Sequence, residues 1–189
     1  VEIIQGNKVS RVYEPFAGLG LCSTIIRTRL EPKLHYMAES DPTLMNHLFK
    51  RFQPNGIDPD AFNESVLLRE GFDFIALDFN TFSIRNILQP KPRTSGALFK
   101  AALTSGKRWL IVTDTAIYRL HLNAKAYSKM AGCEVRDFQS YLTAVNNVVY
   151  PITKRKVVKA GFVYGQAAFV LFDLKGVTGK PKVYDFSAK

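Results

Sequence analysis

Cysteine, histidine and long apolar runs are all scarce in this chain of 189 residues. The two cysteines, Cys22 and Cys133, lie far apart, and neither they nor the three histidines show the spacing of metal ligands. We therefore expect no metal site, and reduced thiols in a cytoplasmic protein rather than the disulfides of a secreted one. No apolar run approaches the ~20 residues of a membrane-spanning helix, which argues against a membrane protein.

Acidic residues are few beside basic ones. The chain has 26 Lys and Arg against 16 Asp and Glu, which gives a formal net charge of +10. Such an excess favours a polyanionic partner, most often nucleic acid. The alternative interpretation is a basic protein that its charge merely keeps soluble. With 47% hydrophobic and 22% charged residues, the composition is otherwise that of an ordinary globular protein with a full core.

Strand and helix patterns alternate along most of the chain. Strands are expected at residues 11–16, 33–38, near 57, 72–77 and 109–113, with an antiparallel pair at 157–164 and 167–174. Helices are expected at 21–29, 42–52, 97–103, 123–130 and 137–145, with a further short helix that follows residues 60–62 and ends near 70. This alternation is typical of a three-layer α/β/α sandwich. No internal repeat or second-domain boundary is visible, so we predict a single domain over residues 1–175 and a polar tail at 176–189.

The stretch at residues 14–20, Glu-Pro-Phe-Ala-Gly-Leu-Gly, joins the first predicted strand to the first predicted helix. Gly18 and Gly20 permit positive φ angles and leave room for a ligand to lie against the main chain. A Gly-x-Gly pair also occurs in plain turns, so its meaning depends on the residues further along the chain. A dinucleotide-binding dehydrogenase would carry a third glycine where Ser23 stands, which argues against that class.

Acidic residues fall at or just beyond the carboxyl ends of predicted strands, where open α/β sheets bind ligands. They are Glu14, Glu39, Asp60, Asp78 and Asp114. Glu39 follows Gly20 by nineteen positions, which suits an acceptor for ribose hydroxyls. Asp41 competes for that role, although its place before Pro42 favours a helix cap. Asp60 is expected near an adenine ring, where it can accept from the exocyclic amine. Solvated strand ends are the alternative interpretation.

Residues 14–20 resemble motif I of class I S-adenosylmethionine-dependent methyltransferases, in the Glu-Pro-Phe-x-Gly-x-Gly form of DNA adenine methyltransferases. Residues 40–44 are similar to the segment after the second strand in those enzymes. Residues 60–62, 72–79 and 112–116 look more like tRNA guanine dimethyltransferases. Together these segments cover roughly residues 11–116.

The resemblance implies a Rossmann-like, mostly parallel seven-stranded sheet whose last strand is antiparallel. It also implies S-adenosylmethionine as the cofactor, whose carboxylate would lie near the first helix's N-terminus. The residues that match the family's cofactor site are Glu14, Phe16, Ala17, Gly18, Gly20, Glu39 and Asp60. The electrophilic methyl group would pass to an acceptor that the protein holds in line.

In amine methyltransferases of this type, Asp-Pro-Pro-Tyr or Asp-Pro-Phe-Gly comes after the fourth strand and holds the target amino group. This chain has Asp78-Phe79-Asn80-Thr81-Phe82. Asp78 matches the acidic position as a catalytic residue, and Asn80 or Phe82 can orient or stack a base. Both prolines are missing, so Asp78 as an ordinary strand-end carboxylate and Phe82 as a core residue stay open as alternatives.

Two basic groups are candidates for phosphate contacts. They are Lys91 and Arg93, in a proline-rich loop, and Lys154, Arg155, Lys156 and Lys159, before the closing strand pair. Solvated basic faces are the alternative. A target base in a duplex would have to be flipped out. The length leaves little room for a target-recognition domain, so a partner subunit is one way to supply it.

The sequence thus predicts an S-adenosylmethionine-dependent methyltransferase that acts on RNA or DNA, with a base nitrogen as the leading acceptor. One alternative is a methyltransferase for proteins or small molecules. The other is a non-catalytic nucleic-acid-binding protein with the same fold.

Overall fold

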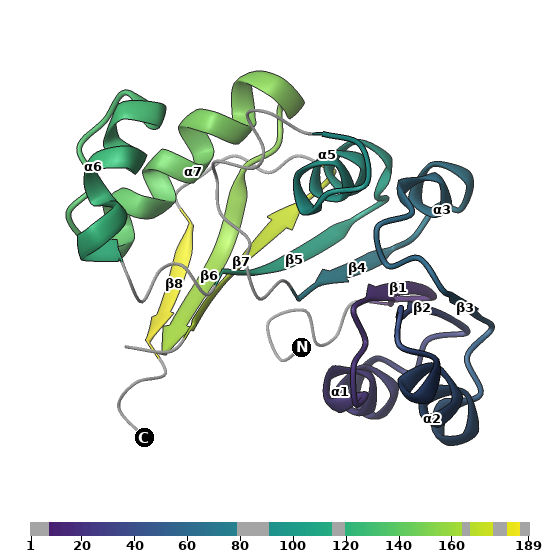
Figure 1. The fold of residues 1–189 in the computed structure, drawn as a ribbon. Coiled ribbons are helices and arrows are strands. Elements are labelled where there is room, and N and C mark those ends of the chain that lie inside the picture. Colours follow the sequence, from purple (N-terminus) through teal and green to yellow (C-terminus); the bar gives the residue numbers. More distant parts are fainter. Residues whose placement is uncertain (1–7, 79–90, 115–119, 164–166, 176–180, 186–189) are drawn as a thin grey trace.

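An eight-stranded sheet with helices on both faces forms the protein (Figure 1). The computed structural model describes residues 8–78, 91–114, 120–163, 167–175 and 181–185. The strand order is β3-β2-β1-β4-β5-β7-β6-β8, and neighbours pair in parallel except that β7 is antiparallel to β5 and β6. The predicted Rossmann-like α/β class, with an antiparallel strand near the end of the chain, is confirmed.

The first half of the chain alternates short strands and helices. Its elements are β1 (Arg11–Pro15), α1 (Leu21–Leu30), β2 (Leu34–Ala38), α2 (Pro42–Phe52), β3 (Gly56–Asp58), α3 (Glu64–Arg69) and β4 (Phe74–Leu77). The Asp41 carboxylate accepts from the backbone N–H groups of Thr43 and Leu44, at 2.7 and 3.2 Å. Pro42 occupies the first helical position, where its missing N–H has no intrahelical partner to lose. Asp41 therefore caps α2, as one of its two interpretations predicts.

The second half completes the sheet. Its elements are α5 (Ser95–Ser105), β5 (Trp109–Asp114), α6 (Leu120–Ala131), α7 (Phe138–Thr153), β6 (Val157–Val163), β7 (Ala167–Asp173) and β8 (Lys182–Asp185). The helix expected at 137–145 continues to Thr153 because Val148 and Val149 extend its buried face. Pro151 lies in the last turn, so it costs the helix a single hydrogen bond.

Strand β8 lies within the segment predicted as a polar tail and brings the described strands to eight instead of seven. It pairs in parallel with β6, with Ala160 opposite Val183 and Gly161 opposite Tyr184. An edge strand is hydrogen-bonded on one side only and half-exposed, so it needs no run of apolar residues. That is why the composition of this segment did not predict a strand.

The two faces of the sheet have separate apolar cores. Tyr13, Phe72 and Phe172 belong to the large cluster shared with α3, α5 and α7. On the opposite face Ile26 of α1 packs with β-strand side chains, and Leu48 of α2 packs with Met37 and Ala17. None of the described helices is long and apolar enough to cross a membrane.

The strand order changes direction at β1. From β1 the chain moves outward to β2 and β3, and then returns to β4 on the other side of β1. Such a reversal opens a crevice at the carboxyl ends of the flanking strands, which is where open α/β sheets bind ligands. The carboxyl ends of β1 to β5 all lie at this edge, together with the acidic residues predicted there.

Candidate functional site

The turn between β1 and α1 has three residues with positive φ. They are Phe16 at 60°, Gly18 at 53° and Gly20 at 76°. The Ala17 N–H donates to the carbonyl of Ala38 at the end of β2, over 3.2 Å. The Phe16 ring packs edge-on against Phe62, with centroids 4.9 Å apart. A left-handed phenylalanine costs about 1–2 kcal/mol, so neighbouring contacts must hold this conformation.

The two glycines of the turn serve different purposes. A Cβ atom on Gly20 would lie 2.3 Å from the ring of Phe52, so Gly20 permits α1 to pack closely on α2. A Cβ atom on Gly18 would meet, among the described residues, only the Phe16 carbonyl oxygen at 3.9 Å. The backbone at Gly18 is therefore open on one side, and a ligand can lie against it.

Helix α1 begins at this turn without a side-chain cap. Gly20 occupies the N-cap position, and the first turn holds no acidic residue. By contrast, Asp41 caps α2, Asn63 caps α3 and Thr94 caps α5. Among the described residues, the first backbone N–H groups of α1 thus have no side-chain cap, an arrangement that suits an anionic ligand group.

Glu39, at the end of β2, contacts the turn directly. One carboxylate oxygen, Oε2, accepts from the Gly18 N–H at 2.9 Å. The other, Oε1, accepts from the N–H groups of Ser40 and Asp41, at 2.8 and 3.0 Å. Each carboxylate oxygen can accept two hydrogen bonds, so Oε2 retains capacity for a hydroxyl. Because Asp41 caps α2, Glu39 is the acidic residue of this pair that faces the turn.

Glu14 belongs to a buried polar network. Its side chain is 3% exposed, and Oε2 accepts from the Ser23 hydroxyl at 2.8 Å and meets His35 Nε2 at 2.9 Å. Arg27 Nε donates to His35 Nδ1 at 3.2 Å. Arginine can only donate, so Nδ1 is an acceptor and the imidazole proton lies on Nε2, which donates to Glu14. The tautomer of His35 is thereby fixed.

The second oxygen of Glu14, Oε1, is buried without a hydrogen-bond partner among the described residues. A buried carboxylate oxygen without a partner costs free energy. Here the cost falls at the end of β1, next to the turn that leads into α1. An N–H donor from a ligand would remove it.

The Cys22 thiol, at the start of α1, feels the negative charge of two carboxylates. Its side chain reaches the surface, yet partial burial raises its pKa to about 11, with further contributions from Glu14 and Asp78. The ends of β1 and β4 therefore bring these two acidic residues into one electrostatic neighbourhood.

Asp60 and Arg93, which the sequence assigned to different roles, form an ion pair. Arg93 Nη2 lies 2.8 Å from Asp60 Oδ2; the Arg93 side chain is exposed and that of Asp60 is half-buried. Asp60 Oδ1 accepts from the Phe62 N–H at 3.0 Å. Beneath them, burial and the carboxylates of Asp58 and Asp60 raise the pKa of the Tyr13 hydroxyl well above its usual range. The end of β3 and the loop before α5 thus meet at this point.

Asp78 is exposed at the end of β4 and bonded to the next strand. Its Oδ1 accepts from the Thr113 hydroxyl at 2.6 Å, which joins the ends of β4 and β5. Asn80 and Phe82 lie outside the described residues, so their predicted roles stay predictions.

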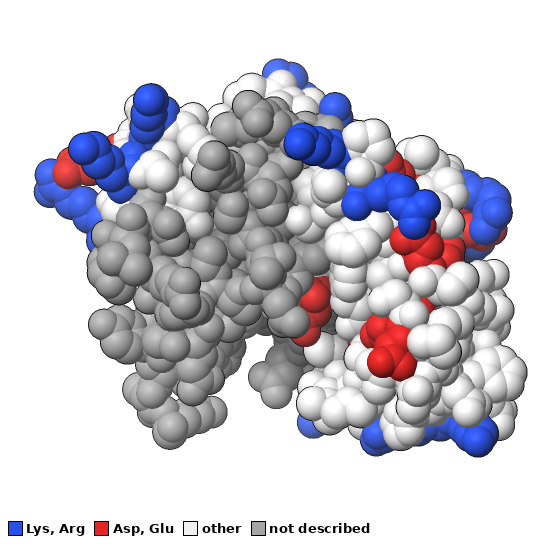
Figure 2. Space-filling view, in the orientation of Figure 1, with Lys and Arg blue, Asp and Glu red and all other residues white. Residues whose placement is uncertain are grey.

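The two basic groups lie at different edges of the sheet. Lys91 and Arg93 precede α5 and are exposed at the edge that carries the crevice. Lys154, Arg155 and Lys156 precede β6, which runs parallel to β5, so they lie at the amino ends of these strands. Lys159 is half-buried within β6. On the described part of the face in Figure 2, acidic side chains gather in the middle and basic ones at the margins.

Ser23, Arg27 and His35 were not predicted from the sequence. The sequence signal that could have indicated this network was His35, a polar residue inside the otherwise apolar strand β2. In the described part of the chain, no three His, Cys, Asp or Glu side chains are arranged to hold a metal ion.

Comparison with solved structures identifies the fold of this chain. Neither the scan against protein-family models nor the search of curated proteins finds a match. Among solved structures, Trm1 from Pyrococcus horikoshii in complex with S-adenosyl-L-methionine has a TM-score of 0.63 and 12% identity, over 90% of this chain and 52% of that one. An rRNA methylase from Streptococcus thermophilus has a TM-score of 0.53 and 12% identity, over 88% of this chain and 87% of that one.

A third neighbour is the magnesium protoporphyrin IX methyltransferase ChlM from Synechocystis PCC 6803, with bound SAH. Its TM-score is 0.54 at 10% identity, over 91% of this chain and 77% of that one. The chain therefore has the fold of class I S-adenosylmethionine-dependent methyltransferases, as the resemblance predicted. It spans about half the length of Trm1. Proteins with this fold include an rRNA methylase and a porphyrin methyltransferase, so the fold leaves the substrate open.

Proposed function

We propose that this chain is an S-adenosylmethionine-dependent methyltransferase that modifies a base nitrogen in nucleic acid. The observation that carries the cofactor assignment is Glu14 Oε1, a buried oxygen without a partner among the described residues, beside the open backbone of Gly18. Both features fit a ligand that brings an ammonium group and lies along the turn. Two of the three structural neighbours contain S-adenosylmethionine or SAH, which supports the same assignment.

Each part of the cofactor has a matching group. Glu14 would accept from the ammonium group, and the uncapped N–H groups of α1 would bind the carboxylate. Glu39 would accept from ribose hydroxyls, and Asp60 from the exocyclic amine of adenine, in competition with Arg93. Phe16, Ala17 and Gly20 would contribute the shape of the turn.

The bound cofactor would supply an electrophilic methyl group on a sulfonium. The protein then has to bring a nucleophilic nitrogen in line with it and exclude water. Asp78 would accept a hydrogen bond from the target N–H, which fixes the direction of the nitrogen lone pair. Thr113 donates to Oδ1 and orients the carboxylate, and Oδ2 would accept from the substrate. Asn80 and Phe82 would orient or stack the base.

Charge supports a nucleic-acid substrate. The net charge is +10, and Lys91 is exposed at the edge of the sheet that carries the crevice. In Figure 2 basic side chains lie above and below the acidic group on the described surface, so phosphates would meet the basic margins while the cationic cofactor meets the carboxylates.

Two measurements test the proposal. Calorimetry with S-adenosylmethionine should show binding that Glu39→Ala weakens, and absence of binding at millimolar ligand would reject the cofactor assignment. Transfer of a labelled methyl group onto total RNA or DNA should be lost in Asp78→Ala while circular dichroism is unchanged. Undiminished transfer by that variant would remove Asp78 from the mechanism.

A second candidate is a non-catalytic nucleic-acid-binding protein on the same fold. The segment after β4 favours it, because Asp78-Phe79-Asn80 lacks both prolines of the amine methyltransferases. This candidate predicts nucleic-acid binding without methyl transfer. A methyltransferase for proteins or small molecules is the third, and labelling of small substrates but neither RNA nor DNA would favour it.

A further inference from the structure

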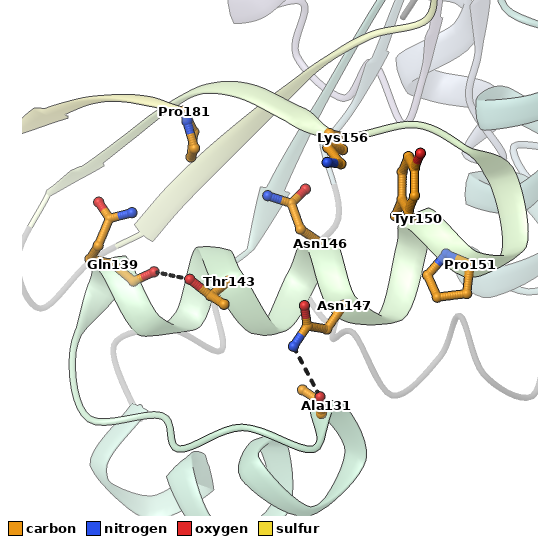
Figure 3. A pocket seen from close by; sticks show the side chains of 9 residues that line it. All are labelled: Ala131, Gln139, Thr143, Asn146, Asn147, Tyr150, Pro151, Lys156 and Pro181. Carbon is orange, nitrogen blue, oxygen red and sulfur yellow. Dashed lines mark hydrogen bonds between the residues drawn. The ribbon is translucent and has the colours of Figure 1, made fainter. Parts of the chain in front are cut away.

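A polar groove of about 950 Å³ runs along helix α7 (Figure 3). Its floor is a stripe of α7 side chains at positions i, i+4, i+7, i+8 and i+11, which share one face of a helix. They are Gln139, Thr143, Asn146, Asn147 and Tyr150. Ala131 at the end of α6 borders one side, and Lys156 and Pro181 border the other.

The Tyr150 end of the groove lies away from the proposed cofactor site. Lys156 directly precedes β6, so this end of the groove lies at the amino ends of the parallel strands. Glu14 and Glu39 lie at the carboxyl ends. A strand of seven residues such as β6 is about 20 Å long, and this is the scale of the separation between the two edges.

Two asparagines in the groove have fixed amide orientations. Asn146 Oδ1 accepts from the Val157 N–H at 2.8 Å, so its amide N–H groups are left to donate. Asn147 Nδ2 donates to the Ala131 carbonyl at 3.2 Å, so its Oδ1 is left to accept. Adjacent residues thus offer a donor and an acceptor, the pair of functions needed to bind a base edge or a ribose hydroxyl.

Cationic groups flank the aromatic ring at one end of the groove. Tyr150 is 41% exposed, and the ammonium groups of Lys156 and Lys154 lie 4.5 and 5.4 Å from its ring centroid. Among the nine described residues that line the groove, Lys156 is the only charged one. Proteins that bind single-stranded nucleic acid combine these two elements, an aromatic face for a base and cations for the phosphates.

The charged residues near the two ends of the groove differ. Its other end begins near the start of α7, where Glu134, Arg136 and Asp137 lie, and the Glu134 carboxylate is paired with Arg136. These three residues carry no net positive charge to attract phosphate, whereas Lys154 and Lys156 do so at the Tyr150 end.

We propose that this groove binds a single-stranded segment of the nucleic-acid substrate, with an unpaired base on Tyr150 and phosphates at Lys154 and Lys156. The inference rests on the proposed function and adds to it a second contact region, distant from the methylated base. Because Tyr150 and the proposed cofactor site lie at opposite edges of the sheet, a polynucleotide reaches both and a mononucleotide does not.

Fluorescence anisotropy with a labelled single-stranded oligouridylate tests the groove. Tyr150→Ala should weaken binding about tenfold, and Tyr150→Phe, which keeps the aromatic face, should stay within about twofold of the wild type. Lys156→Gln should weaken binding and lower the slope of log affinity against log salt by about one. The matched control is Lys50→Gln on α2, which removes the same charge from an exposed position outside the groove.

The outcomes separate the groove from the enzyme. Wild-type RNA affinity in Tyr150→Ala would overturn the groove proposal. So would a loss of RNA affinity in Lys50→Gln equal to that in Lys156→Gln. Binding of a protein partner that depends on Tyr150, with RNA affinity unchanged, would overturn it as well. Cofactor binding by calorimetry should be the same in all four variants. RNA binding that depends on Tyr150, without methyl transfer, would reject the proposed enzyme activity and support the groove. Methyl transfer that is unchanged in Tyr150→Ala would support the enzyme activity and reject the groove.

Discussion

His35 Nε2 lies 2.9 Å from Glu14 Oε2, and the two side chains are 0% and 3% exposed. The imidazole therefore holds one oxygen of a buried carboxylate whose other oxygen has no partner among the described residues. Arg27 holds the far side of the ring. Hydrogen bonds therefore run from Arg27 on α1, through His35 on β2, to Glu14. The other oxygen of Glu14 is the one proposed to bind the cofactor.

His35 should position Glu14 rather than contact the cofactor. His35→Leu removes both hydrogen bonds of the ring, and we expect it to lower the free energy of unfolding by about 2–4 kcal/mol. His35→Gln can donate to Glu14 and accept from Arg27, so it should restore most of the stability and of the cofactor affinity. Urea denaturation and calorimetry on both variants check this, and equal behaviour of the two would contradict it.

Glu14→Gln should separate stability from binding. The amide oxygen can still accept from Ser23 and His35, and the buried negative charge is gone. We expect the free energy of unfolding to change by no more than about 1 kcal/mol, because loss of the buried charge offsets the cost of the unpartnered amide N–H groups, together with at least about tenfold weaker cofactor binding. A variant that loses stability but keeps its affinity would show that Glu14 has a purely structural role.

Alanine substitutions should distinguish the two glycines of the turn. Gly20→Ala places a methyl group against Phe52 at a φ of 76°, so we expect a loss of about 2–4 kcal/mol in the free energy of unfolding. Gly18→Ala meets, among the described residues, only the Phe16 carbonyl oxygen at 3.9 Å, so its cost should be the ~1 kcal/mol of the left-handed backbone. Its cofactor affinity should nevertheless fall, because the methyl group projects into the space proposed for the ligand. Thermal unfolding and calorimetry on both variants test this contrast.

Cys22 should be slow to alkylate even though its side chain reaches the surface. With a pKa of about 11 the thiol is protonated at pH 8, and the rate with iodoacetamide should rise as the pH approaches that value. Asp78→Asn removes one carboxylate that raises the pKa, so it should speed alkylation at pH 8. The measurement uses a Cys133→Ser background, and an unchanged rate in Asp78→Asn would refute the proximity of the two residues.

The same pKa gives a pH dependence of stability. The folded-state pKa of Cys22 lies above its unfolded value of 9.0, so folding favours the protonated thiol. Its contribution to stability is complete below pH 9 and is lost as the pH rises to about 11. Cys22→Ser should remove this part of the alkaline loss in urea midpoints measured between these two pH values.

Local sequence patterns predicted the strands and helices that surround the site. The ends of β1, β2 and β4 and the cap of α2 follow from periodicity, glycine and proline positions, which act within a few residues. That is why Glu39 and Asp78 were placed correctly at strand ends. The Glu14–His35–Arg27 network could not be predicted in this way, because it depends on contacts among β1, β2 and α1. The pairing of Asp60 with Arg93 was missed for the same reason, since 33 residues separate them.

The antiparallel strand β7 affects how the protein folds. It fills the place between β5 and β6, and pairs Trp109 with Asp173 at one end of the β5–β7 ladder. Until residues 167–173 leave the ribosome, β5 has an unpaired edge of apolar residues, a site for wrong pairing or aggregation. We expect nascent chains arrested before Ala167 to be far more sensitive to protease than chains arrested after Asp173. Resistance of the shorter chains would mean that the first five strands are stable without their late partner.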